Sequence, residues 1–377
     1  MSNPIPGKIR VVAFELINNF GTASETRSEI WQLVLGTTIY ENIFNPCMFG
    51  IAKIVDSYNL YATLPITDQT YVHICLQDPS NGKTINSLFK IYKVSNIEQD
   101  TTKLQTYIIH FISADVFNAN RIRVNTKIKG SIPSEVEKIH SRISSKPIQI
   151  TTDSSKATIY LPFMTAQQSI SLLTENASWR GAVPDYCYWE TFYNYNFKSL
   201  AACMLENPIH DFSTNSQLSR GLYDDFIYED FIKINDIVVQ ENFDSVNMLK
   251  NGYAGSTVFS YDPISGTSYL DATGDEPLSR AIVFSDRALD YVRLARRMQI
   301  LRQITNTYYY INVPGLLSRC SGDVANVTVY NGNNMNVKDT TLSGKRLICG
   351  IAHNIIIDKY NQNITLGDYY LGSEAKA

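Results

Sequence analysis

Short apolar runs separated by turn-forming clusters dominate the first third of the chain. The runs are rich in Val, Ile, Tyr and Phe, a composition that favours strands. Turn clusters at 78–82 and 98–102 separate them at the spacing typical of an antiparallel barrel or sandwich. The predicted strands span 9–17, 30–35, 38–43, 48–55, 71–76, 88–94 and 106–113. Residues 1–118 are therefore predicted to form a first tube-like β-barrel domain.

Helical periodicity replaces this pattern after residue 119. Apolar residues recur at intervals of four, three and four around Pro133, and proline suits the first turn of a helix. These residues are Ile132, Val136, Ile139 and Ile143. A second helix is predicted from Thr165, which forms a capping box with Gln168. With an extended segment at 148–160 and a hairpin turning near Asn194, residues 119–215 are predicted to form an α+β connecting domain.

Strand patterns return from about residue 228. They predict strands at 231–239 and 255–261, and then a helix capped by Ser285 that continues to about Arg302. Further strands are predicted at 307–313, 323–330, 345–357 and 363–371. We interpret residues 216–305 as completing the connecting region and starting the second barrel. Residues 306–377 are predicted to form the second tube-like β-barrel with a C-terminal tail.

The strand–turn–strand pattern at the end of the first β section recurs near the C-terminus. Strands at 89–94 and 107–113 flank a polar turn, and strands at 347–357 and 364–371 flank the turn 358–363. The two segments are not similar enough to prove a duplication, but both predict barrel-closing hairpins at matching ends of their β sections. The predicted fold class is α+β, mainly β, with two similar antiparallel tube-like β-barrels flanking an α+β connecting domain.

Composition and charge then limit the classes of function. A formal net charge of −3 argues against wholesale nucleic-acid binding, which usually shows as a basic domain or stripe. The 24 tyrosines fit either an interface or simple strand preference. Six scattered cysteines without a CxxC pair predict buried free thiols in a reducing compartment. With no apolar signal core and no membrane-spanning window, we expect a chain made and kept in the cytosol until assembly.

The histidines predict no catalytic or metal site. No HxxxH, HExxH or Cys/His cluster is present among His73, His110, His140, His210 and His353. His110 and His353 fall within apolar strands, where a packed or interface histidine is favoured over a ligand or base. No Walker A loop, GxGxxG unit or GxSxG elbow is found. We therefore expect no catalytic, cofactor-binding or metal-binding residues and no cofactor.

One acidic group leaves a catalytic alternative open. Asp224, Asp225, Glu229 and Asp230, with Asp236 beyond them, could supply paired carboxylates for acid–base chemistry or ligands for a hard cation. No EF-hand spacing or glycine turn accompanies these acids. A solvated strand edge is therefore the favoured interpretation.

The predicted helix after Ser285 is basic. Its cations are Arg287, Arg293, Arg296, Arg297 and Arg302, against two aspartates. Arginines pair with acids across protein interfaces and extend over apolar surface, which favours an interface role. Contact with DNA or with an acidic partner surface is the alternative.

Short motifs follow one another along most of the chain, and their order is more informative than any one of them. A strand at 107–113 precedes the helix 133–143, and the run from Leu161 to Thr165 leads into the next helix. Later come 188–190, 196–200, 243–244, 251–254, 261–263, 313–315, 322–324 and 343–353. In this order and spacing the chain resembles the central baseplate hub proteins of contractile-tailed bacteriophages. It departs from them at Tyr193–Asn194, where a glycine is expected, and in the length of the polar loop 331–336.

The resemblance implies a structural role without catalysis. Members of that family form homotrimers in which each subunit contributes two tube-like barrels, so three subunits present six. Such a hub adapts a threefold cell-puncturing spike to the sixfold tail tube, with a central channel for DNA passage. The implied partners are the spike, the tail-tube initiator, the tape-measure protein and other baseplate proteins, with no specific DNA binding and no membrane-spanning segment. The implied location is the virion, in the tail baseplate, after assembly in the host cytoplasm.

Two other functions stay open at this point. The acids from Asp224 to Asp236 would suit a tail-associated cell-wall hydrolase. A hub from a contractile injection system outside phages would share the fold and symmetry. On the hub interpretation, His353 becomes a packing or interface residue, and the polar loop 331–336 becomes a candidate partner contact.

Overall fold

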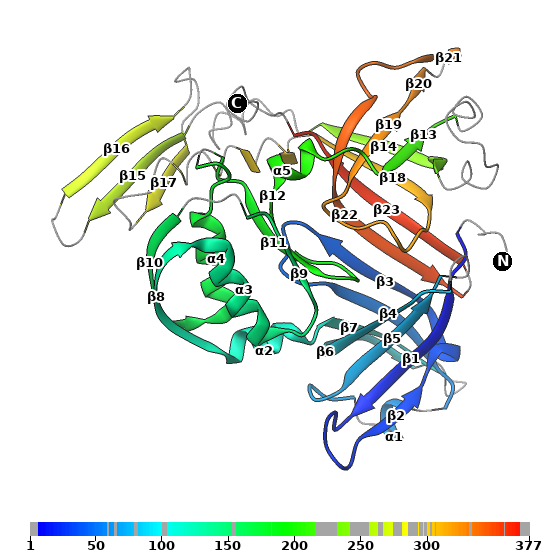
Figure 1. Ribbon diagram of the computed structural model, residues 1–377. Coiled ribbons are helices and arrows are strands. Elements are labelled where there is room, and N and C mark those ends of the chain that lie inside the picture. Colours follow the sequence, from blue (N-terminus) through cyan, green and yellow to red (C-terminus); the bar gives the residue numbers. More distant parts are fainter. Residues whose placement is uncertain are drawn as a thin grey trace.

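The structure is a computed structural model of the 377-residue chain. It describes residues 7–58, 60–63, 66–78, 82–99, 104–152, 156–181, 183–215, 232–241, 256–262, 267–273, 281–285, 293, 297, 300–301, 304–305, 307–331, 334–357 and 359–369. Figure 1 shows a large twisted sheet on one side of the molecule. Helices α2, α3 and α4, with the β8–β10 ribbon, lie on the other side.

The first β section forms largely as predicted, although a short strand at 26–29, a 3-10 turn at 31–33 and a helical turn at 60–63 were not predicted. Its elements are β1 (Arg10–Asn18), β2 (Thr26–Glu29), η1 (Trp31–Leu33), β3 (Val34–Asn42), β4 (Phe49–Asp56), α1 (Leu60–Thr63), β5 (Tyr71–Gln77), β6 (Thr84–Gln99) and β7 (Gln105–Ser113). The strand predicted at 30–35 is wrong, because a 3-10 turn occupies 31–33 and β3 begins at Val34. The Glu29 side chain accepts the Trp31 N–H at 2.9 Å, which starts the turn.

The connecting section confirms the helical periodicity. Its elements are α2 (Asp115–Arg121), β8 (Arg123–Ser131), α3 (Ile132–Ile143), β9 (Ile148–Ile150), β10 (Lys156–Thr165), α4 (Ala166–Asn176), β11 (Tyr186–Glu190), β12 (Tyr195–Ser199) and α5 (Leu200–Leu205). All four periodic apolar residues of α3 are buried. The capping box of α4 is confirmed, with Gln168 N donating to Thr165 Oγ1 at 3.1 Å and Thr165 N donating to Gln168 Oε1 at 3.0 Å.

The β11–β12 hairpin turns without glycine. Thr191 N donates to the Asn194 carbonyl at 2.8 Å, and the Thr191 hydroxyl donates to Asn194 Oδ1 at 2.8 Å. Tyr193 and Asn194 are not among the residues with positive φ, so the turn needs no left-handed backbone. Side-chain hydrogen bonds of Thr191 therefore replace the glycine that the resemblance leads one to expect.

The remaining elements are again mainly strands. They are β13 (His210–Ser213), β14 (Asp236–Glu241), β15 (Ser256–Asp262), β16 (Thr267–Thr273), β17 (Ala281–Ser285), β18 (Thr307–Pro314), β19 (Val324–Thr328), β20 (Tyr330–Asn331), β21 (Asn334–Lys338), β22 (Gly344–Ile356) and β23 (Lys359–Gly367). Ser285 is the last residue of β17. Helical backbone is described at Arg293, Arg297, Ile300, Leu301, Ile304 and Thr305. The residues just after Ser285 lie outside the described ones, so its role as a cap stays a prediction.

One sheet runs through both β sections. Its strand order is β14-β18-β23-β22-β3-β4-β7-β6-β5-β1-β2, with β19 pairing β22 and β13. The two sections meet where β22 pairs antiparallel with β3, with Ile351 opposite Glu41. The two predicted hairpins that resemble each other, β6–β7 and β22–β23, are both present in this sheet. The class, α+β and mainly β, is confirmed, and the described strands follow an open path from β14 to β2.

Candidate functional surface

The continuous sheet has one buried face and one open face. Along β22 and β23, Ile351 and Ile364 lie in the core, while Ala352 and Asn363 lie at the half-exposed or exposed positions between the buried ones. The strand registers align such residues into rows that cross the sheet. We call these rows the open face: Tyr310, Asn312, Asn361, Asn363, Thr365, Ala352, Asn354, Thr38, Tyr40, Asn42, Phe49, Ile51, His110 and Ile112.

The centre of the open face carries no full charge. Among the residues named above, only His110 is ionisable near neutral pH. Burial and the neighbouring Lys93 lower the pKa of the His110 imidazole, so this ring is neutral at neutral pH. Its Nε2 lies 2.8 Å from the Ser95 hydroxyl. Charged side chains lie at the margins of the face: Lys53, Lys93 opposite His110, Lys359, and Asp236 opposite Asn312 at the β14 edge.

Hydrogen bonds between amides and hydroxyls connect the strands on this face. Asn312 Nδ2 donates to Asn363 Oδ1 at 2.6 Å across β18 and β23. The Thr38 hydroxyl donates to Asn354 Oδ1 at 3.0 Å across the seam between β3 and β22. The result is a wide polar surface whose centre carries no charged side chain. A charged partner can move along or contact this part of the surface without strong electrostatic attraction to it.

Behind the seam lies a buried carboxylate, that of Glu41 on β3. Its Oε1 accepts the Phe192 N–H at 3.1 Å, and its Oε2 accepts the Ser321 N–H at 3.1 Å. Phe192 belongs to the β11–β12 turn of the connecting section, and Ser321 belongs to the loop before β19. One fully buried side chain thus links three sections of the chain.

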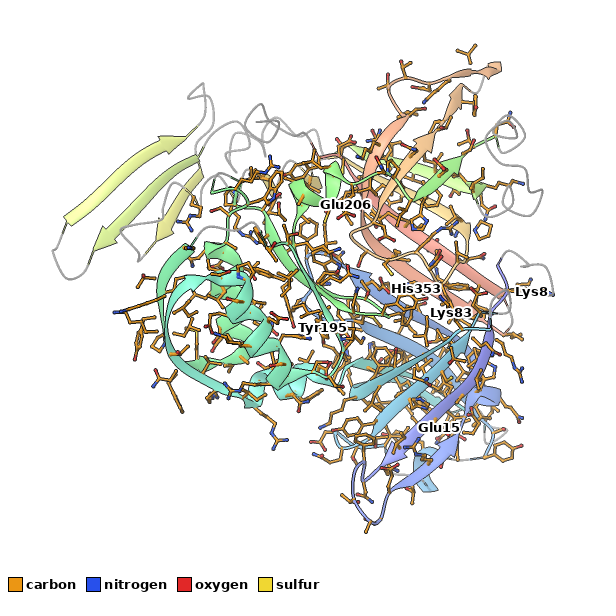
Figure 2. The ribbon with its side chains drawn as sticks, viewed as in Figure 1. Lys8, Glu15, Lys83, Tyr195, Glu206 and His353 are labelled. Carbon is orange, nitrogen blue, oxygen red and sulfur yellow. The ribbon has the colours of Figure 1, made fainter. Side chains whose placement is uncertain are left out.

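His353 continues this network from β22. Its Nε2 lies 3.4 Å from Glu41 Oε1, and its Nδ1 lies 2.7 Å from the Tyr360 hydroxyl. Gln362 Nε2 donates to the Tyr360 oxygen at 2.9 Å, and burial together with Glu41 raises the pKa of Tyr360 well above its usual value. The protonated hydroxyl is therefore free to donate to Nδ1. Within the described part of the chain Nε2 makes no hydrogen bond, although Glu41 is nearby. Figure 2 shows His353 in the interior, where β22 and β23 approach β3.

Arg319 closes the network from the loop side. Its Nη1 donates to the Pro314 carbonyl at 2.7 Å and to Gln362 Oε1 at 3.0 Å. Gln362 Nε2 also donates to the Leu316 carbonyl at 2.9 Å. These bonds hold the loop between β18 and β19 against β23.

A second buried carboxylate fixes the connecting section to the first β section. Glu190 Oε1 lies 2.6 Å from Lys146 Nζ, and its Oε2 accepts the Met48 N–H at 3.0 Å. Lys146 Nζ also donates to the Thr191 carbonyl at 3.0 Å. A buried ion pair with these extra partners orients the β11–β12 hairpin against β4.

Two glycines permit close packing at the same junction. A Cβ at Gly315 would overlap the ring of Tyr360, and one at Gly322 would overlap the ring of Trp189. Gly322 also has φ +93°, a region that other residues rarely adopt. Trp189 Nε1 donates to the Ser321 carbonyl at 2.9 Å, which locks the indole in place. The glycine motifs at 313–315 and 322–324 therefore serve packing.

The five histidines are dispersed over the structure. His353 is buried in the junction, His110 lies on the open face, and His210 lies 3.0 Å from the Asp323 carboxylate. His140 is buried 3.0 Å from the Tyr188 hydroxyl. His73 lies 3.0 Å from the Glu15 carboxylate at the far end of the sheet. No group of three or more His, Cys, Asp or Glu is placed to hold a metal ion within the residues that the structure describes.

The two charged groups are only partly described. Asp224, Asp225, Glu229 and Asp230 lie outside the described residues, and Asp236 begins the edge strand β14. Arg293 donates to the Asn176 carbonyl, and Arg297 donates to the Pro184 and Tyr186 carbonyls. These two arginines make contacts within the chain. The other three arginines lie outside the described residues.

Part of the polar loop 331–336 lies in a short hairpin. Asn331 and Asn334 pair in the β20–β21 hairpin, whose tip lies outside the described residues. Among the described helices, none has the length and apolarity that crossing a membrane requires. Sequence reasoning missed Glu41 and Glu190, although an acid at an inward position of an apolar strand was a visible signal.

Comparison with known proteins identifies the fold. No protein-family model and no curated protein matches the sequence. A tail protein from Neisseria meningitidis MC58 matches with a TM-score of 0.58 and 10% identity, covering 94% of this chain and 96% of that one. The 43 kDa tail protein of prophage MuSo2 from Shewanella oneidensis matches with a TM-score of 0.60 and 9% identity, covering 94% and 99%.

A third similar structure comes from a secretion system. It is an E. coli protein described as a component of the type VI secretion system with structural similarity to the T4 bacteriophage tail proteins gp27 and gp5. It matches with a TM-score of 0.50 and 8% identity, covering 96% of this chain and 77% of that one. The chain therefore has the fold that phage and prophage tail proteins share with a type VI secretion component.

Proposed function

We propose that this chain is the central hub of a contractile phage-tail baseplate, a structural protein without catalytic activity. The observation that carries the proposal is the single sheet that joins both β sections and presents an uncharged open face across their seam. The fold shared with phage tail proteins supports the same assignment. The chain would reside in the virion, at the tail baseplate, after assembly in the host cytoplasm.

In this proposal the open face forms the wall of a central channel. Each phosphate of DNA carries a negative charge, so a basic wall would bind the passing duplex and an acidic wall would repel it. Amide, hydroxyl and aromatic side chains do neither. The neutral rows centred on Asn312, Asn363 and Asn354 therefore suit a passage for DNA without specific binding.

The two β sections supply the symmetry adaptor. The proposed units are a first tube-like barrel at 1–118, a connecting domain at 119–215, a transitional region at 216–305 and a second tube-like barrel at 306–377. Three copies would then present six tube-like units in a ring. The buried Glu41 junction would keep the two units of one copy at a fixed angle, because its hydrogen bonds come from both units and from the turn between them.

The proposed partners follow from that position. The threefold face would bind a cell-puncturing spike, and the other face would contact the tail-tube initiator, the tape-measure protein and other baseplate proteins. The E. coli relative's similarity to both gp27 and gp5 supports a hub that works beside a spike. The β20–β21 hairpin would be one of the contacts.

Electron microscopy of the purified protein tests the proposal. We expect a threefold ring with a pseudo-sixfold outline and an open centre, and a trimer mass by light scattering. Co-purification with a spike protein encoded beside it would be the second readout. A protein that stays monomeric and never binds the spike would contradict the hub function.

A second candidate is the hub of a contractile injection system outside phages. The match to the E. coli secretion component favours it. Both functions need the same ring and spike contact, and they differ in what passes through or beside the channel. Genes for a capsid and packaging machinery beside the coding sequence would decide for the phage.

A further inference from the structure

The β8–β10 ribbon presents a basic and aromatic outer face. Its four cations, Arg123, Lys127, Lys129 and Lys156, are all exposed. Two aromatic rings accompany them: 60% of Tyr160 and 70% of Phe163 are accessible to solvent. Neither strand contains an aspartate or glutamate.

The fold holds these side chains outwards. Val124, Ile128 and Leu161 occupy the inner side of the ribbon and are buried against α3 and α4. Tyr160 lies opposite Lys127 in the register. Its hydroxyl donates to Asn125 Oδ1 at 3.2 Å, which fixes the ring beside the lysine.

Phe163 sits at an irregular point of the ribbon. The register shifts between Leu161 and Met164, and Phe163 has φ +38°, an unusual conformation for an aromatic residue. Strained bulges of this kind redirect side chains and occur at functional positions. A large ring held in solvent on a ribbon that carries four cations marks a docking surface for an acidic partner with apolar residues.

None of the four cations forms an ion pair with a carboxylate among the residues that the structure describes. Among the described residues, the ion pairs of carboxylates involve other bases, such as Lys138 with Glu135 and Lys146 with Glu190. The ribbon is therefore a concentrated positive patch on a chain whose net charge is −3. An acidic partner surface would complement it.

The most acidic stretch of the sequence fits this patch. Residues 224–230 read Asp-Asp-Phe-Ile-Tyr-Glu-Asp, four acids around three apolar residues. The described residues on either side of this stretch both lie at β13. Ser213 forms a bridge with Lys233, and its carbonyl accepts the Ile234 N–H at 2.9 Å. Figure 1 shows β13 and β14 on the opposite side of the molecule from β8 and β10. A neighbouring copy is therefore better placed than the same copy to bring these acids to the ribbon.

We propose that the basic ribbon of one copy docks against the acid-rich residues 224–230 of a second copy. This inference rests on the proposed ring and names the contact that closes it. A head-to-tail contact between opposite sides of a subunit generates a closed ring when the rotation permits. Four acids against four cations give attraction and orientation, and the apolar residues of the acidic stretch cover Tyr160 and Phe163.

Charge reversal in the full-length chain tests this contact. Sedimentation equilibrium at low and high salt measures self-association of the wild type, of Lys127→Glu/Lys129→Glu and of Asp224→Lys/Asp225→Lys. We expect either double variant to weaken association by about tenfold or more at low salt, and high salt to weaken the wild type. A chain carrying all four changes should regain association. The control is Lys8→Glu/Arg10→Glu, which makes the same change of charge at exposed residues near the start of β1 and should associate like the wild type.

Other outcomes separate the inference from the hub function. If both double variants form rings like the wild type, the ribbon contact is wrong while the hub function stands. If the ribbon variant keeps its rings but loses affinity for a short duplex DNA, measured by fluorescence anisotropy, the patch is a nucleic-acid surface and the inference fails. If residues 224–230 bind the ribbon of the same copy, the variants change thermal stability without changing association. That result also overturns the proposed contact between copies. A wild type that never associates, alone or with spike, removes the hub function as well.

Discussion

The carboxylate of Glu41 lies 3.4 Å from Nε2 of His353, although the two residues come from strands near opposite ends of the chain. Both are fully buried, and both face away from the open face of the sheet. The pair marks the point where the first β section, the β11–β12 turn and the last β section meet.

Glu41→Gln tests how strongly this junction holds the sections together. An amide presents a donor where the carboxylate accepts a backbone N–H, so one buried N–H loses its partner. We expect a loss of about 2–4 kcal/mol in the free energy of unfolding, measured by urea denaturation. The control Glu135→Gln removes only the exposed pair with Lys138 and should cost less than about 1 kcal/mol. Equal losses in the two variants would show that the Glu41 junction is not a stabilising feature.

Gly322→Ala tests the close approach to Trp189. The added Cβ would overlap the indole and would also need the unfavourable φ of +93°. We expect a destabilisation of about 2–4 kcal/mol, seen as a lower Tm. Gly21→Ala is the matched control, because Gly21 has φ +76° but nothing within 4 Å of an added Cβ. If both changes cost the same, backbone conformation alone explains the effect and the contact with Trp189 contributes nothing.

The cysteines should react slowly in the folded protein. All six are free, and burial is the main cause that raises the pKa of each thiol, to about 12 for Cys47, about 11 for Cys187 and about 12 for Cys203. Only the thiolate is nucleophilic, so its fraction stays very small until the pH approaches these values. Labelling by a thiol reagent should therefore remain slow between pH 7 and about pH 9. The urea-denatured chain should label rapidly over the same range, and fast labelling of the native chain would contradict the burial.

Asn312→Lys/Asn363→Lys tests the neutrality of the open face. The two lysines would add positive charge where the channel wall is proposed, so the variant should bind duplex DNA with a salt-dependent affinity that the wild type lacks. Fluorescence anisotropy with a short duplex gives the readout, and the ring should still form. The control is Asn120→Lys, an exposed position on α2 that should not create DNA binding within the ring. Wild-type DNA binding as tight as that of the variant would exclude a neutral channel.

Local patterns in the sequence predicted local structure well. The apolar spacing of 132–143 gave the buried side of α3, and Thr165 with Gln168 gave the cap of α4. Both depend on residues within a few positions of each other. The same holds for the hairpins β6–β7 and β22–β23, whose strands flank short turns.

Long-range pairing could not be predicted in this way. Nothing in the alternation of β3 or β22 indicates that the two strands are neighbours, because either would pair equally well with another half-buried strand. The turn at 31–33 was missed since it depends on a hydrogen bond from the Trp31 N–H to the Glu29 carboxylate, which apolar periodicity does not record. The burial of Glu41 likewise depends on N–H groups supplied by distant loops.

The pairing of β22 with β3 also has a consequence during synthesis. The ribosome makes β3 early and β22 late, so the edge of β3 stays without its partner while most of the chain is translated, on the order of tens of seconds at ordinary elongation rates. An unpaired edge with one apolar face is a template for wrong pairing with other chains. The last strands to emerge therefore decide whether the first strands reach their native partners or aggregate.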